Sequence, residues 1–290
     1  MKQLCVYTKS TKRLHLTLEH SFENNLGLSR IKELYQNQKL DYVYFGNDLC
    51  ENKIPSIAEI DEMISYLDKK NLKFVFVTPN VTMFGMQKVK EILSFFSNQK
   101  VFFDVVFNDW GVFSLIKKEY QQFSLIAGRL LHGMIKDPRI NLEQVKKTLT
   151  PVGEKYFKSS NGLSKKYQKM LLDVHVVRLE LDNPPQGLHI GETLIPISMY
   201  VPYGIVTRGR ICMFREGNDA GTGNYRVDGS CDNLCKNYYQ RMWTEVPGQV
   251  GDSSHVELFR QGNAIEYFND NLNYIINSSY IDRIIYQPDL

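Results

Sequence analysis

The chain lacks the long apolar runs that mark membrane-spanning or exported proteins. No window of its 290 residues holds about eighteen consecutive apolar residues, the length that suggests a transmembrane helix. The first residues, MKQLCVYTKSTKRLHL, contain no apolar core of a signal peptide. A hydrophobic fraction of 43% and a charged fraction of 23% disfavour a disordered or fibrous class. These absences predict a protein without membrane insertion that stays in the cytoplasm.

Familiar catalytic motifs are also missing. The 6 histidines form no H-E-x-x-H pair, and no serine lies in a G-x-S-x-G elbow, so a peptidase mechanism has no support from single residues. The glycine-rich stretch 217–229 lacks the lysine of a phosphate-binding loop and is expected to be a surface loop. The net charge is only +3 and comes from interleaved acids and bases, so RNA binding is allowed but not indicated.

Eight short runs rich in β-branched and aromatic residues alternate with segments of helical spacing, which predicts parallel strands joined by helices. The strand candidates are residues 3–9, 40–46, 72–79, 102–109, 123–131, 174–182, 196–206 and 280–287. The helix candidates are residues 54–70, 86–98 and 113–120, and residues 158–169 are expected to be a loop and the start of a helix. An α/β fold with a doubly wound sheet fits, but eight strands favour a (β/α)8 TIM-barrel-like fold, irregular or incomplete. We expect one domain over residues 1–290.

The cysteines are the strongest functional signal. Five is an odd number for a disulfide framework, and a reducing compartment would keep them as thiols, so clustering indicates metal binding. Cys231 and Cys235 are four residues apart, which places them on one face of a predicted helix that begins near Gly229 and Ser230. A helix N-terminus would lower the pKa of both thiols.

Two further cysteines each follow a predicted strand. Cys50 comes after residues 40–46 and Cys212 after residues 196–206, and the carboxyl ends of barrel strands share one rim. Cys5 lies within the first strand, where a buried structural role is the usual one. Four thiolates suit zinc or an iron–sulfur cluster. One close pair with two solitary cysteines favours the cluster, while zinc and merely buried thiols are the alternatives.

Other polar residues are candidates for contact with substrate or with the metal site. Arg208, Arg210 and Arg215 flank Cys212, where guanidinium groups would balance an anionic cluster or bind an acidic substrate; ordinary surface arginines are the alternative. Asn108 and Asp109 end a predicted strand and face the same rim, unless they are a helix cap.

Four stretches of the sequence resemble the collagenase-like peptidase family of unknown catalytic type. They are DYVYFGNDLC, VVFNDWGVFSLI, IAGRLL, and TRGRICMF together with SCDNLC. The resemblance is to a short, UbiV-like branch that assists oxygen-independent ubiquinone hydroxylation. It implies a barrel-like fold and a [4Fe-4S] cluster held by Cys50, Cys212, Cys231 and Cys235. It also implies a second related subunit as a heterodimer partner and a small aromatic substrate. Other branches hydroxylate RNA bases or are described as proteases, and a zinc-binding scaffold without redox chemistry is a further hypothesis.

Overall fold

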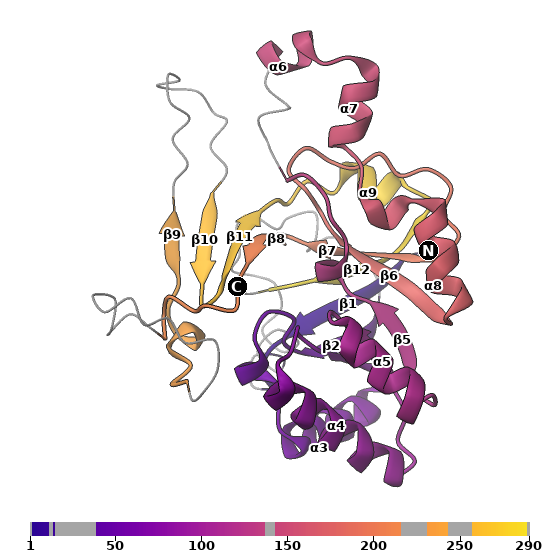
Figure 1. The fold of residues 1–290 in the computed structure, drawn as a ribbon, viewed down its shortest axis with the longest axis vertical. Helices are drawn as coiled ribbons and strands as arrows, with labels where there is room; N and C mark the ends of the chain where they lie inside the picture. Colours follow the sequence, from indigo (N-terminus) through magenta and orange to yellow (C-terminus); the bar gives the residue numbers. More distant parts are fainter. Residues whose placement is uncertain are drawn as a thin grey trace.

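Eight parallel strands close into a barrel in the order β1-β12-β7-β6-β5-β4-β3-β2 (Figure 1). The computed structural model describes residues 2–11, 14, 39–136, 143–215, 231–242 and 257–288. The barrel strands are β1 (Gln3–Thr8), β2 (Leu40–Gly46), β3 (Lys73–Val77), β4 (Asp104–Phe107), β5 (Ser124–Ala127), β6 (Val176–Asp182), β7 (Ile197–Val201) and β12 (Ile281–Tyr286). All eight predicted runs contribute a barrel strand, so the predicted TIM-barrel-like α/β fold is confirmed.

Three helices on the outside of the barrel lie where the apolar spacing predicts them. Those after β2, β3 and β4 cover one side of the barrel (Figure 1). The longer helices are α3 (Ile57–Lys70), α4 (Met83–Asn98), α5 (Trp110–Glu119), α6 (Glu143–Thr148), α7 (Pro151–Phe157), α8 (Lys165–Asp173) and α9 (Asn273–Asn277). The short 3-10 turns are η1 (Glu51–Lys53), η2 (Arg129–Leu131), η4 (Asn161–Leu163) and η6 (Leu234–Lys236). No described helix joins β6 to β7, so the βα alternation is irregular.

Helix α3 shows how local sequence sets these boundaries. The Ser56 hydroxyl accepts a hydrogen bond from the Glu59 N–H, and the Glu59 carboxylate accepts one from the Ser56 N–H, which is a complete capping box. The helix buries Ile60 and Leu67 against the strands and ends at Asn71, whose φ of 55° is left-handed. The start, the buried face and the end therefore all follow from short-range pattern.

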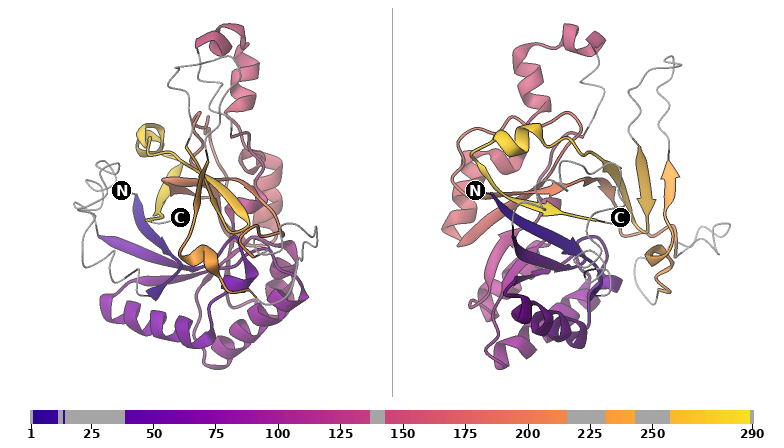
Figure 2. Two further views of the ribbon diagram at one scale, coloured as in Figure 1. Left: turned by 90° about the vertical axis from the view of Figure 1, so that its left-hand side faces the viewer. Right: turned by 180° about the vertical axis from the view of Figure 1, so that it is seen from behind.

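A four-stranded antiparallel sheet stands at the carboxyl end of the barrel (Figures 1 and 2). Its strand order is β8-β11-β10-β9. Its strands are β8 (Tyr203–Arg208), β9 (Gln240–Met242), β10 (Leu258–Gln261) and β11 (Ala264–Phe268). The single strand predicted over residues 196–206 is wrong: the run divides at Pro202 into barrel strand β7 and sheet strand β8. The division could not be predicted because β-forming residues lie on both sides of Pro202.

The interior of the barrel contains several polar side chains. Glu180 is fully buried on β6, and its neighbours inside the barrel include the Tyr44 and Tyr200 rings. The Arg283 guanidinium stacks 3.8 Å from the Tyr42 ring centroid and donates to the Tyr44 hydroxyl at 2.7 Å. None of the helices in the described ranges is long and apolar enough to span a bilayer.

Candidate functional site

All four predicted cysteine ligands line one small cavity between the barrel rim and the antiparallel sheet. Cys50, Cys212, Cys231 and Cys235 surround a volume of about 40 Å³. They come from three separate chain segments: the loop after β2, the loop after β8, and the η6 region. Cys5 lies inside the barrel, where its thiol is fully buried, and it does not line this cavity.

The Cys50 loop is fixed by its own short-range hydrogen bonds. β2 ends at Gly46, whose φ is 135° and where a Cβ would stand 2.2 Å from the Val77 carbonyl oxygen, so only glycine fits. The Asn47 side chain then accepts hydrogen bonds from the Leu49 and Cys50 N–H groups, at 3.0 and 2.7 Å. The turn holds Cys50 at the barrel rim.

Glu51 anchors the same loop to the next helix. Its carboxylate accepts hydrogen bonds from the Thr82 N–H at 2.7 Å and from the Thr82 hydroxyl at 2.9 Å. Thr82 is the residue that precedes α4, so a negative charge sits at the amino end of that helix. The ligand loop is therefore joined to the helical layer as well as to the strand.

The segment with the close cysteine pair has a different local structure from the predicted one. The predicted helix is wrong: Asn233 has a left-handed φ of 55°, Leu234–Lys236 form a single 3-10 turn, and strand β9 follows at Gln240. The predicted helix start at Gly229 and Ser230 lies outside the described residues. Cys231 and Cys235 nevertheless both line the cavity, although they do not lie on an α-helix.

A glycine turn leaves room between two of the sulfurs. Gly262 has a φ of 62°, and a Cβ at this position would stand 3.3 Å from Cys235 Sγ and 3.8 Å from Cys212 Sγ. A side chain here would press against Cys235 Sγ and come into van der Waals contact with Cys212 Sγ. The absence of a side chain at Gly262 thus keeps the inner wall of the cavity open.

Backbone N–H groups point toward the sulfurs of this set. The Asn233 N–H donates to Cys231 Sγ at 3.4 Å. Burial raises the pKa of the Cys50 thiol, opposed by the backbone N–H of Asn52 and the positive charge of Lys53. Burial also raises the pKa of the Cys212 thiol, again opposed by backbone N–H groups, those of Arg215 and Phe214. Such donors stabilise thiolate and tune iron–sulfur centres.

The three predicted arginines also reach the cavity. Arg208, Arg210 and Arg215 line it together with the four cysteines. Burial lowers the pKa of Arg208, while the Asp48 carboxylate opposes that shift. An arginine stays protonated in proteins, so these side chains bring positive charge to a sulfur-rich site.

Asn108 and Asp109 have structural hydrogen bonds. Asp109 is the N-cap of α5, with Oδ1 accepting from the Gly111 N–H at 2.6 Å, which is the helix-cap alternative. The Asn108 amide donates to the Thr78 carbonyl oxygen at 2.9 Å and accepts from the Leu130 N–H at 3.1 Å. Neither residue is among those that line the four-cysteine cavity.

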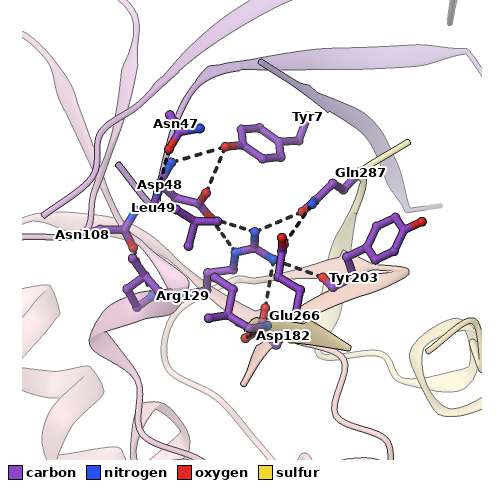
Figure 3. A network of polar contacts seen from close by, with 12 residues as sticks. Tyr7, Asn47, Asp48, Leu49, Asn108, Arg129, Asp182, Tyr203, Glu266 and Gln287 are labelled. Carbon is purple, nitrogen blue, oxygen red and sulfur yellow. Dashed lines mark hydrogen bonds and ion pairs between the residues drawn. The ribbon is translucent and has the colours of Figure 1, made fainter. Parts of the chain in front are cut away.

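A buried ion network lies beside the cysteine cavity (Figure 3), and the sequence analysis did not identify it. Its centre is Arg129, only 3% exposed, which donates to Asp48 at 2.7 Å, to Asp182 at 3.0 Å and to Gln287 at 3.0 Å. The Tyr200 ring centroid lies 4.0 Å from the guanidinium carbon. The available signal was an arginine near the carboxyl end of the run 123–131, since residues at that end of a barrel strand belong to the rim.

This network joins the two cysteine-bearing loops. Arg129 holds Asp48, two residues before Cys50, and also donates to the Tyr203 carbonyl oxygen at the start of β8. Asn263 adds a second link, because its side-chain amide donates to the Leu49 and Gly209 carbonyl oxygens, each at 2.7 Å. Both connections fix the loop of Cys50 relative to the loop of Cys212.

The donor set matches the chemistry of a thiolate-bound metal centre. Four sulfurs, backbone N–H groups and nearby arginines surround one space, which fits the anionic core of an iron–sulfur cluster. Within the described ranges, no three His, Cys, Asp or Glu side chains are grouped closely enough to hold a metal ion as they stand. The four cysteines line one cavity, but their sulfur atoms do not converge closely enough to bind a single metal ion.

A second, larger cavity adjoins the first. Its volume is about 790 Å³, and Asn52 and Cys235 line both cavities. A volume of this size suits a metabolite-sized molecule. The arrangement thus places space for a small ligand next to the cysteine set.

Comparison with known proteins finds similarity in structure and none in sequence. No family model matches the chain, and no curated protein matches it. The structure of the U32 peptidase Mk0906, from the collagenase-like family, aligns with a TM-score of 0.42 and 8% identity, over 100% of this chain and 94% of that one. The spore cortex-lytic enzyme SleL of Bacillus megaterium QM B1551 aligns with a TM-score of 0.32 and 9% identity, over 98% of this chain and 70% of that one.

Proposed function

We propose that this chain is an iron–sulfur protein whose [4Fe-4S] cluster is held by Cys50, Cys212, Cys231 and Cys235. One observation carries the proposal: three separate segments bring exactly these four cysteines, out of five, to one cavity that arginines also line. A merely structural cysteine is buried among apolar side chains, as Cys5 is.

Each surrounding group has a role in holding such a centre. The four thiolates are the ligands, and the backbone N–H groups directed at Cys50, Cys212 and Cys231 stabilise their negative charge. Arg208 and Arg210 offset the charge of the site. When bound, the cluster would supply one-electron redox chemistry.

We place this chemistry in the oxygen-independent hydroxylation of a small aromatic substrate, together with a second related subunit. The sequence resemblance supports this assignment, and so does the 790 Å³ cavity that shares Cys235 with the cysteine site. An open cavity beside a redox centre allows a bound molecule to exchange electrons with it. The protein is proposed to act in the cytoplasm, where its thiols stay reduced.

Anaerobic metal analysis tests the proposal. Protein expressed and purified without oxygen is expected to contain iron and acid-labile sulfide in equal amounts and to absorb broadly near about 400 nm. Alanine variants of the four ligands should each lose iron and sulfide, whereas Cys5→Ala should retain both. Zinc without iron or sulfide would instead support a zinc scaffold and refute the cluster.

A further inference from the structure

The larger cavity carries an excess of positive charge. Among the residues that the structure describes, four lysines line it, Lys9, Lys53, Lys88 and Lys236, against two carboxylates. Both carboxylates are engaged on their own helices: Glu59 completes the capping box with Ser56, and Glu91 accepts a hydrogen bond from Gln87 at 2.9 Å. The carboxylates in the lining are therefore occupied, while the cations face a common space.

Two of these cations, Lys9 and Lys53, lie close together and form no ion pair among the described residues, although the Glu266 and Asp48 carboxylates act on Lys9 from a greater distance. The Lys9 ammonium is shut off from solvent and has no hydrogen-bond partner in the described part of the chain. Burial lowers the pKa of Lys9, the Glu266 carboxylate opposes that, and the positive charge of Lys53 lowers it further. No ion pair of Lys53 is found within the described ranges. Two neighbouring ammonium groups in a partly buried wall repel each other, and an anion between them would remove that cost.

Part of the remaining wall is apolar, beside polar residues such as Asn52, Ser56 and Gln261. Ile54, Ile57 and Ile92 line the same cavity, and Cys235 lies at its boundary with the cysteine site. A ligand that fits both kinds of wall has an apolar body and one negatively charged head. Inorganic anions lack the body, and uncharged aromatics lack the head.

We propose that the 790 Å³ cavity binds a small organic carboxylate, with its head at Lys53, the buried charge of Lys9 behind it, and its apolar body against Ile54, Ile57 and Ile92. The inference names the substrate class of the proposed redox site, and its catalytic meaning rests on that proposed function. Binding itself requires only the cavity.

Calorimetric titration of metal-free protein with benzoate, benzamide and inorganic phosphate tests this site. Benzoate is expected to bind at least about tenfold more tightly than either of the other two, because it alone has both features. Lys53→Met should weaken benzoate binding about tenfold and Lys9→Met severalfold, since Lys9 acts through its charge rather than by contact. The matched control is Lys90→Met, a lysine on α4 whose side chain is 45% exposed and pairs with Glu119; it should bind like wild type.

Equal binding of benzoate and benzamide, tighter binding of phosphate, or no benzoate binding at millimolar concentration would each overturn the proposal. Should Lys9→Met fail to fold, reductive methylation of wild type followed by mass spectrometry gives a second measurement: benzoate should slow labelling of Lys53 and leave Lys90 unaffected. Unchanged labelling of Lys53 refutes the site. Benzoate binding without iron incorporation contradicts only the proposed function, and iron incorporation without benzoate binding contradicts only the carboxylate site.

Discussion

The Arg129 network and the four-cysteine cavity lie side by side at the barrel rim and differ in how their polar groups are satisfied. Arg129 is almost fully buried, and both aspartates and the glutamine around it complete its hydrogen bonds within the chain. The cysteine cavity gathers four thiols around an open space instead. A buried polar cluster whose hydrogen bonds are all made within the chain stabilises the fold, whereas polar groups arranged around an open space indicate a ligand-binding site.

The comparison also explains why the two regions adjoin. A thiolate site formed by separate loops needs those loops held at fixed positions before the metal binds. Arg129 provides this rigidity through Asp48, next to the Cys50 turn, and through Tyr203 at the start of β8. The Arg129 network therefore supports the four-cysteine cavity, which is the candidate ligand site.

The largest expected effect is a loss of stability when the Arg129 network is disrupted, compared with a small loss at the cysteine cavity. Arg129→Met removes the guanidinium from between two buried carboxylates, leaving Asp48 with the Tyr7 hydroxyl and Asp182 with Lys136, and should lower the free energy of unfolding by about 3 to 5 kcal/mol. Arg210→Met, at the exposed side of the cysteine cavity, should cost less than about 1 kcal/mol. Urea denaturation of metal-free protein measures the free energy of unfolding of both variants. Equal losses of stability would show that the Arg129 network does not contribute more to the fold than the cysteine cavity does.

Glu180 is a fully buried carboxyl inside the barrel, with the Tyr200 hydroxyl beside it. Burial raises its pKa to about 8. The folded chain therefore keeps the proton that the unfolded chain releases above its ordinary pKa of about 4.3, so stability is lost as pH rises from there to about 8. Glu180→Gln should stabilise the protein by about 3 kcal/mol at pH 7, and by little near pH 4.5.

Thermal or urea unfolding at both pH values checks this prediction. A variant that is less stable than wild type at pH 7 would show that Glu180 is ionised and paired in the folded protein. Glu192→Gln is a suitable control, because Glu192 is an exposed carboxylate paired with Lys165, and the stability of this variant should stay close to that of wild type at both pH values.

His132 provides a smaller test with the opposite pH direction. Burial lowers the pKa of its imidazole to about 4, with the Ala127 carbonyl oxygen opposing that shift. The unfolded chain takes up a proton below about 6.5, so the stability is fully present above that pH and declines as pH falls toward 4. Between pH 7 and 5 the loss should be about 2 kcal/mol.

The pH dependence of unfolding in His132→Gln should lack this contribution. His175→Asn is the matched control, because His175 is exposed and its left-handed φ of 62° suits asparagine. If His132→Gln keeps the slope of wild type, the imidazole is not the group that titrates in this range.

Asn263→Ala should have the smallest effect on stability and the most local one. It removes the two hydrogen bonds that tie the Cys50 and Cys212 loops together, at a cost of about 1 kcal/mol. Iron bound at the proposed site should then be lost severalfold faster to a chelator. Retention equal to that of wild type would mean that Arg129 alone positions the loops.

Local pattern was sufficient for the barrel and for choosing four cysteines that share one cavity. Each barrel strand coincides with a run of β-branched and aromatic residues, and the start of α3 follows from the Ser56 and Glu59 capping box. These features depend on neighbours two to four positions apart. The choice of four cysteines was local as well: Cys50 and Cys212 follow predicted strands, and Cys231 and Cys235 are four residues apart.

Tertiary structure decided the rest. The antiparallel sheet, the division of the 196–206 run at Pro202 and the non-helical turn at Asn233 follow from pairing with distant strands, which overrides local preference. Arg129 and Gln287 are 158 positions apart, and no spacing in the sequence indicates that they meet. The sequence by itself determined which segments contribute barrel strands and that Cys50 follows one of them, because those properties are local. The closed barrel decided which charges are neutralised and which face a cavity, because burial and partners exist only once the chain has folded.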